Sequence, residues 1–118
     1  MAQLTCKATV RFKGFSRANL RILTGLLVVA ERTDDVARIV ITSANDSRHS
    51  KTSQHYKNAA VDVRSRSFKT AAARDRFLTR ITWNLGKRFT VLYEGHGTPN
   101  AHIHIQQKKG TTYAGPLA

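Results

Sequence analysis

The chain has 118 residues, enough for one domain with a buried core and too few for two. Its hydrophobic content of 41% excludes wholesale disorder, and its single cysteine excludes an internal disulfide framework. Twenty Lys and Arg against seven Asp and Glu give a formal net charge of +13, which favours anionic partners such as nucleic acid, an anionic membrane face or a phosphate-rich cell wall.

Neither a targeting segment nor a membrane span is predicted. The N-terminus lacks the basic-then-apolar pattern of a secretory signal, so we expect a protein that is cytoplasmic at synthesis. The longest apolar run, GLLVVA at 25–30, is far shorter than the roughly 20 residues that a membrane span requires. We therefore expect no membrane insertion.

The first half of the chain predicts a strand, a helix and a second strand. Residues 8–12 alternate weakly, which predicts a short strand. Ser16 is a suitable N-cap, and apolar residues recur at helical spacing after it, so we expect a helix over 17–31. These apolar residues are Leu20, Leu23, Leu26, Leu27 and Ala30. The β-branched run at 36–43 predicts a strand, and a polar loop follows over 44–58.

The second half predicts a strand, a helix and two further strands. A short strand is expected at 59–64, and Thr70 could cap the second helix. The apolar stripe of this helix and its expected C-terminal cap are Ala73, Phe77, Ile81, Leu85 and Gly86. Strands at 88–94 and 101–106 flank a turn-rich loop, and the C-terminal tail is expected to fray. The pattern predicts an α+β domain, with a small antiparallel or mixed sheet and helices packed on one face.

The histidines cluster in the second part of the chain. All five fall between residues 49 and 104: His49, His55, His96, His102 and His104. His102 and His104 lie two apart in a predicted strand, so both side chains leave the same face of the sheet, as ligands of one metal ion would. For this pair alone, two exposed histidines without a ligand are an equally acceptable interpretation.

Two carboxylates favour the metal interpretation. Asp62 lies in the middle of the strand AAVDV, where aspartate is rare and a buried charge is costly unless it is paired or bound to metal. The alternative is a solvent-facing position at a sheet edge. Two histidines and one carboxylate, with a fourth position open for water, make up a catalytic zinc site. Glu94, at the end of the strand before AHIHIQ, is the leading candidate for the general base. The alternative is that Glu94 is an ordinary solvated carboxylate at the edge of a loop.

SQHYKNAAVDV at 53–63 resembles the Ser-x-His-x-x-Gly-x-Ala-x-Asp motif of the zinc D-alanyl-D-alanine carboxypeptidase family, which includes phage endolysins and dipeptidases acting on peptidoglycan stems. The matching residues are Ser53, His55, Ala60 and Asp62, and Asn58 stands in place of the glycine. VLYEG followed by HIHIQ resembles the second half of that motif set, and the Hedgehog signalling domain, which shares the fold and the zinc site, is similar too. The resemblance runs from about 39 to 107, within a motif-bearing core of about 36–107.

The resemblance implies a role for each matching residue. It implies His55, Asp62 and His104 as zinc ligands, Glu94 as general base, His49 and His102 as residues lining the site, and Ser53 as a residue near the substrate. The position of this ligand differs in other members of the family, and by their pattern His102 would be the ligand in place of His104. The loop between Glu94 and His102 is longer than is usual in the family. Either it bulges while Glu94 stays in place, or Glu94 is displaced and His96 takes part.

These features predict a zinc metallopeptidase that hydrolyses peptidoglycan stem peptides or cross-links, as a carboxypeptidase or an endopeptidase. Residues 1–118 would be a single-domain phage or prophage lysin, held by its basic surface on anionic cell-wall polymer after release, or carried in a virion. One alternative is a catalytically silent zinc-bearing binding module, which would not need Glu94. The other is a His-hydrophobic-His nuclease with Tyr113 as nucleophile. It would leave Ser53, His55 and Asp62 unexplained, so nucleic acid is the disfavoured partner.

Overall fold

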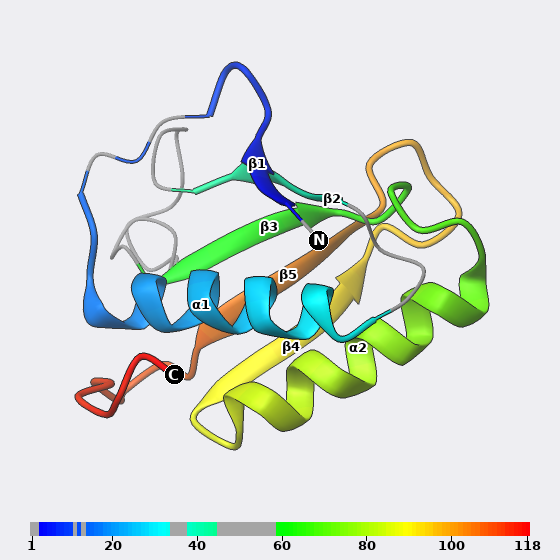
Figure 1. The fold of residues 1–118 in the computed structure, drawn as a ribbon. Coiled ribbons are helices and arrows are strands. Elements are labelled where there is room, and N and C mark those ends of the chain that lie inside the picture. The colour runs from blue at the N-terminus through cyan, green and yellow to red at the C-terminus, as the bar shows by residue number, and fades with distance from the viewer. Residues whose placement is uncertain (1–2, 11, 13, 34–37, 45–58) are drawn as a thin grey trace.

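The computed structural model describes residues 3–10, 12, 14–33, 38–44 and 59–118. They form a small α+β fold with a five-stranded mixed sheet and two helices (Figure 1), which confirms the predicted class. In chain order the elements are β1 (Gln3–Cys6), α1 (Arg17–Glu31), β2 (Arg38–Ser43), β3 (Ala60–Arg64), α2 (Ala71–Leu85), β4 (Phe89–Glu94) and β5 (His102–Gln107). Neither of the described helices is both long and apolar enough to cross a bilayer.

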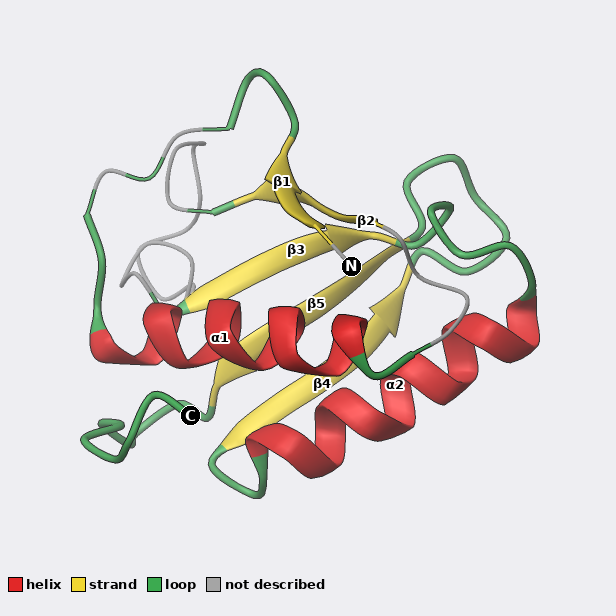
Figure 2. Ribbon diagram, viewed as in Figure 1, coloured by secondary structure: helices red, strands yellow, loops and turns green. Residues whose placement is uncertain are grey.

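The order of strands in the sheet is β1-β2-β3-β5-β4. The strands β1 and β2 run parallel, and all other neighbours are antiparallel. Both helices lie on the same side of the sheet, as Figure 2 shows. Because β5 lies between β3 and β4, the strand that carries Asp62 and the strand that carries the His-x-His pair are direct neighbours.

Local signals define both helices. The Ser16 side chain accepts a hydrogen bond from the Asn19 backbone N–H at 3.1 Å, and Thr70 accepts one from the Ala73 N–H at 3.1 Å. Each cap satisfies a backbone donor that has no partner within its helix. Gly86, with φ of +80°, ends α2 in a conformation that glycine adopts without strain. The predicted bounds of both helices are confirmed.

The core lies between the helices and the facing side of the sheet. Its largest fully buried apolar side chains are Ile22, Leu26, Ile39, Ile41, Val61, Val63, Phe77, Ile81, Ile103 and Ile105. Alternate residues of β3 and β5 belong to this set, and each such burial contributes about 1.5–3 kcal/mol. The residues between them therefore leave the opposite face of the sheet, which fixes the direction of Asp62, His102 and His104.

Two predictions for the first thirty residues are wrong. Residues 8–10 form a turn, with the Val10 N–H bonded to the Lys7 carbonyl at 2.9 Å, so the described part of 8–12 is not a strand. The first strand is β1, which pairs with the strongly β-branched β2. In α1, Leu20 and Leu27 are exposed although both belonged to the predicted stripe. Apolar residues lie on several sides of α1, so packing against the sheet selects the buried face.

The C-terminal tail is packed rather than frayed. The ring of Tyr113 lies 5.2 Å from that of Phe89, and its backbone N–H donates to Gln107 Oε1 at 2.9 Å. The Arg17 Nε donates to the Gly115 carbonyl at 2.5 Å, which links the tail to the start of α1. The composition of the tail carries no signal for these contacts, because they depend on where β4 and β5 end.

Candidate active site

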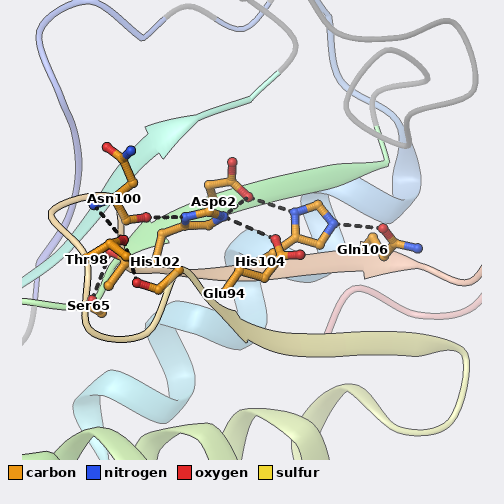
Figure 3. A network of polar contacts seen from close by, with 10 residues as sticks. Asp62, Ser65, Glu94, Thr98, Asn100, His102, His104 and Gln106 are labelled. Atoms are coloured by element: carbon orange, nitrogen blue, oxygen red, sulfur yellow. Dashed lines mark hydrogen bonds and ion pairs between the residues drawn. The ribbon is translucent and has the colours of Figure 1, made fainter.

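The face of the sheet opposite the helices carries a row of polar side chains. We call it the polar face, and it comprises Asp62 and Arg64 on β3, Glu94 on β4, and His102, His104 and Gln106 on β5. The register between β3, β5 and β4 places these side chains in two rows that run across the strands. One row pairs His104 with Asp62, and the other pairs His102 with both Arg64 and Glu94. Figure 3 shows the contacts that connect Asp62, Glu94, His102, His104 and Gln106.

Asp62 and His104 form the centre of the polar face. The Nδ1 of His104 lies 2.7 Å from Oδ1 of Asp62, and the two side chains are only 13% and 16% exposed. The Nε2 of His104 lies 2.7 Å from Oε1 of Gln106 (Figure 3). The mid-strand aspartate is therefore a largely buried carboxylate paired with histidine and not a solvated edge residue.

The pKa of His104 is raised above its ordinary value. Burial of the ring lowers the pKa, but it is outweighed by the hydrogen bonds to Asp62 and Gln106 and by the negative charges of Asp62 and Glu94. Both ring nitrogens face oxygen atoms, which accept and do not donate hydrogen bonds. The raised pKa and the contact with the Asp62 carboxylate favour the protonated form of the His104 ring over the neutral one.

His102 is oriented by the loop that precedes it. Its Nδ1 lies 2.7 Å from the carbonyl oxygen of Asn100 and donates to it, because a carbonyl can only accept. Its Nε2 lies 3.2 Å from Oε1 of Glu94 and 3.8 Å from Oδ1 of Asp62. The ring therefore directs Nε2 toward both carboxylates.

Glu94 lies beside His102, and the long loop does not displace it. The ladder between β4 and β5 continues without a shift from Phe89 to Glu94, so the extra residues are confined to the loop 95–101. Thr98 donates its side-chain O–H to the Gly95 carbonyl at 2.6 Å and its backbone N–H to the same oxygen at 3.0 Å. Gly95 has φ of +69°, which glycine tolerates. Of the two arrangements left open by the sequence, the structure has the bulged loop with Glu94 in place.

His96 lies away from the polar face. Its ring is 5.3 Å from the ring of Tyr93, which packs against the core and also lies under the guanidinium of Arg74 at 4.4 Å. The structure therefore does not bring His96 together with His102 and His104. The alternative in which His96 takes part in place of Glu94 is not supported by this position.

Four residues of the predicted site lie outside the described part of the chain. They are His49, Ser53, His55 and Asn58, all within 45–58. Their predicted roles stay predictions, including that of His55 as the first zinc ligand. The described residues bring together the other predicted members, Asp62, Glu94, His102 and His104.

The side chains of Asp62, His102 and His104 meet some of the requirements of a zinc site. Within the described residues, no group of three or more His, Cys, Asp or Glu side chains could hold a metal ion as they stand. Zinc with bonds of about 2.0–2.2 Å in tetrahedral geometry separates neighbouring ligand atoms by roughly 3.3 Å. The 2.7 Å pair of Asp62 and His104 would have to open slightly, and His102 Nε2 lies 3.8 Å from the same carboxylate oxygen. Carboxylate and neutral imidazole are ligand types that zinc takes, so Asp62 and His104 are chemically suited to it, provided that His104 gives up the proton that its raised pKa favours. The third ligand stays a prediction.

A pocket of about 540 Å³ adjoins this site, and sequence reasoning did not find it. Asp62 and His102 lie on its wall together with Lys7, Arg64 and Arg66. Alternation along β3 could have placed Arg64 beside Asp62, and alternation along β5 could have placed Gln106 beside His104. Lys7 and Arg66 lie beyond strand ends, where periodicity carries no information.

Comparison with known proteins gave no match: no family model matches the sequence, and no curated protein or solved structure matches the chain. The resemblance to zinc peptidoglycan peptidases therefore stays a prediction from the two motifs.

Proposed function

We propose that this chain is a zinc-dependent peptidase that hydrolyses peptide bonds in peptidoglycan stem peptides or cross-links, as a phage or prophage lysin. One observation carries the proposal. Asp62 and His104, which belong to two separate motifs 42 positions apart, are cross-strand neighbours with their polar atoms 2.7 Å apart. The net charge of +13 supports attachment to anionic wall polymer.

Asp62 and His104 would hold the zinc, with the third ligand from His55 or His102. When bound, zinc supplies a Lewis acid and lowers the pKa of its water to about 7. The low exposure of Asp62 and His104 supports such a role, because a partly dry site strengthens electrostatic interactions.

Glu94 and His102 would carry out the proton transfer and the charge stabilisation. Glu94 takes the proton from the attacking water and delivers it to the leaving amine. Its carboxylate is 47% exposed, so it can reach water, and His102 Nε2 holds its Oε1 at 3.2 Å. If His55 supplies the third zinc ligand, His102, which is oriented by the Asn100 carbonyl, would stabilise the negative charge that develops on the substrate oxygen.

The positions of the described tyrosines weigh against Tyr113 as the nucleophile of a His-hydrophobic-His nuclease. That nuclease would need a tyrosine beside the histidine pair. Tyr93 and Tyr113, the tyrosines in the described part of the chain, both pack against the core. The binding module keeps Asp62 and His104 and differs from the peptidase in having no catalytic step, so an activity assay separates the two.

The test is release of new amino groups from purified cell walls by the zinc-loaded protein. We expect release that a chelator stops and zinc restores, and that Asp62→Ala abolishes. Asp75→Ala is the matched control, because Asp75 is a carboxylate on α2 that is 63% exposed and contacts Arg74. If the zinc-loaded protein releases nothing, the binding module replaces the peptidase. Release that survives complete removal of zinc contradicts the mechanism.

A further inference from the structure

The strand β4 forms one edge of the sheet (Figure 1). The Lys108 backbone N–H donates to the Arg88 carbonyl at 2.9 Å, which continues the ladder between β4 and β5 by one residue. Backbone groups alternate in direction along an antiparallel strand, so Val91 and Tyr93 direct their N–H and C=O groups away from β5. No described residue bonds to these outward groups, and such unpaired groups can pair with a further strand.

Compared with the other edge strand, β4 is well suited to pairing. It has six residues, whereas β1 has four. Most of its residues, Phe89, Thr90, Val91 and Tyr93, are of types that are enriched in strands. Edge strands commonly avoid pairing through lysine, proline or a bulge, and β4 contains none of these. Its one charged residue, Glu94, is the last of the strand.

A groove of about 300 Å³ lies between β4 and α2. It is lined by uncharged side chains, namely Leu78, Thr79, Thr82 and Trp83 of α2 and Val91 and Tyr93 of β4. Trp83 is 83% exposed, although tryptophan is largely buried in most proteins. A strand added to β4 would direct alternate side chains toward the α2 side of the sheet, next to this groove. The groove therefore offers apolar surface to such a strand.

The charges at the two ends of β4 indicate that the added strand is β4 of a second copy. Arg88 and Glu94 lie three residues to either side of Val91, and both lie on the polar face of the sheet. When Val91 lies opposite Val91 of the second copy in an antiparallel pair, Arg88 of each copy lies opposite Glu94 of the other. Opposite charges that face each other across strands stabilise the pair. In this register the two Val91 residues also exchange backbone hydrogen bonds, because both direct these groups outward.

Both charged residues are available for this contact. Arg88 is exposed and forms no ion pair within the described residues. Glu94 is 47% exposed and uses Oε1 for His102, so a guanidinium can reach its other oxygen. The net charge of +13 opposes association, but such repulsion is screened beyond about 8 Å at physiological ionic strength, whereas the contact of Arg88 with Glu94 is direct.

We propose that β4 pairs in antiparallel orientation with β4 of a second copy of this chain, with Val91 at the twofold axis. The two sheets then form one continuous sheet. Arg88 of the second copy lies beside Glu94, so each copy contributes a side chain to the polar face of the other. The inference rests on the edge, the groove and the charges, and it does not depend on the proposed zinc or peptidase function.

The test is sedimentation equilibrium of the full chain at roughly 0.15 M salt and at protein concentrations from about 1 μM to about 1 mM. We expect the mass to rise toward that of two chains. Arg88→Glu and Glu94→Arg each place like charges opposite each other at two symmetric contacts, so each should weaken the dimer roughly 10-fold or more. An equimolar mixture of these two variants should form a mixed dimer, because every contact is then between opposite charges. Lys87→Glu and Glu31→Arg are the matched controls, since they change the net charge equally at exposed residues outside the contact.

The outcomes separate this contact from association through another surface. The double variant that carries both Arg88→Glu and Glu94→Arg restores opposite charges in both contacts and should dimerise like the wild type. Weak dimers of the two single variants, with recovery in their mixture and in the double variant, support the proposal. The mass of one chain at every concentration of the wild type overturns it. A dimer that both single variants leave intact, or a mixture that associates no more tightly than the variants alone, overturns it as well.

Discussion

Replacing Glu94 by glutamine separates a catalytic role of this residue from a structural one. The substitution keeps the shape of the side chain and removes its ability to take a proton. Glu94 Oε1 lies 3.2 Å from His102 Nε2, and a glutamine oxygen can still accept that hydrogen bond. Asp62 and His104 are unchanged, so zinc binding should be retained.

The expected sizes of the two effects differ widely. Glu94 is 47% exposed, and an exposed ion pair contributes about 0–1 kcal/mol to stability. For a domain of this size, a loss of this amount should lower the melting temperature by at most about 8 °C. Loss of a positioned general base should slow hydrolysis by roughly 100-fold to 10,000-fold. A large fall in rate with little change in melting temperature would identify a catalytic residue.

The assay is the rate of amine release from purified walls by zinc-loaded protein, with a thermal melt of the same sample. Glu31→Gln is the matched control, since Glu31 is an exposed glutamate at the end of α1. His96→Ala should also react as fast as wild type, because its ring contacts Tyr93 and not the polar face. If Glu94→Gln reacts as fast as Glu31→Gln, Glu94 is not the base and the reasoning fails.

Three further predictions follow from the structure. The pKa of His104 is raised in the folded protein, so protonation of this ring stabilises the metal-free fold. This stabilisation should be complete below the unfolded pKa of about 6.5 and should be lost as the pH rises through the folded pKa. Thermal melts across this pH range should show the loss in the wild type and not in His104→Gln. Attachment of Asp62→Ala to isolated cell walls should weaken sharply with added salt, because exposed charges are screened beyond about 8 Å at physiological ionic strength; retention independent of salt would contradict a purely electrostatic attachment. Tyr113→Ala should destabilise the protein by about 1–2 kcal/mol, because the ring packs on Phe89; an unchanged denaturation midpoint would show that the tail does not dock.

The sequence predicted α2 well because several signals agree there. Thr70 caps the helix, Gly86 ends it, and one apolar stripe fills its buried side. In α1 the cap at Ser16 was equally clear, but apolar residues on several sides left the buried face undetermined. Strand β1 was missed because its four residues have no alternating pattern, and its existence depends on parallel pairing with β2.

The centre of the candidate site was predictable, and its surroundings were not. Alternation on either side of Asp62 and His104 determines the face on which each lies, and the order of the two motifs suggested that they meet. The sheet order that makes β3 and β5 neighbours depends on long-range pairing that no local pattern encodes. The pocket depends further on the turn at Arg66 and on the loop 95–101, whose shape comes from hydrogen bonds such as that between Thr98 and Gly95.

The most direct test of the account is the zinc content of the purified protein after dialysis, measured together with that of Asp62→Ala, His104→Ala and the control Asp75→Ala. The account predicts one zinc per chain in the wild type and the control, and almost none in the two site variants, because each removes a ligand from the centre of the polar face. Absence of zinc from the wild type, with no change in melting temperature when zinc is added, would contradict it, as would full zinc content in both site variants.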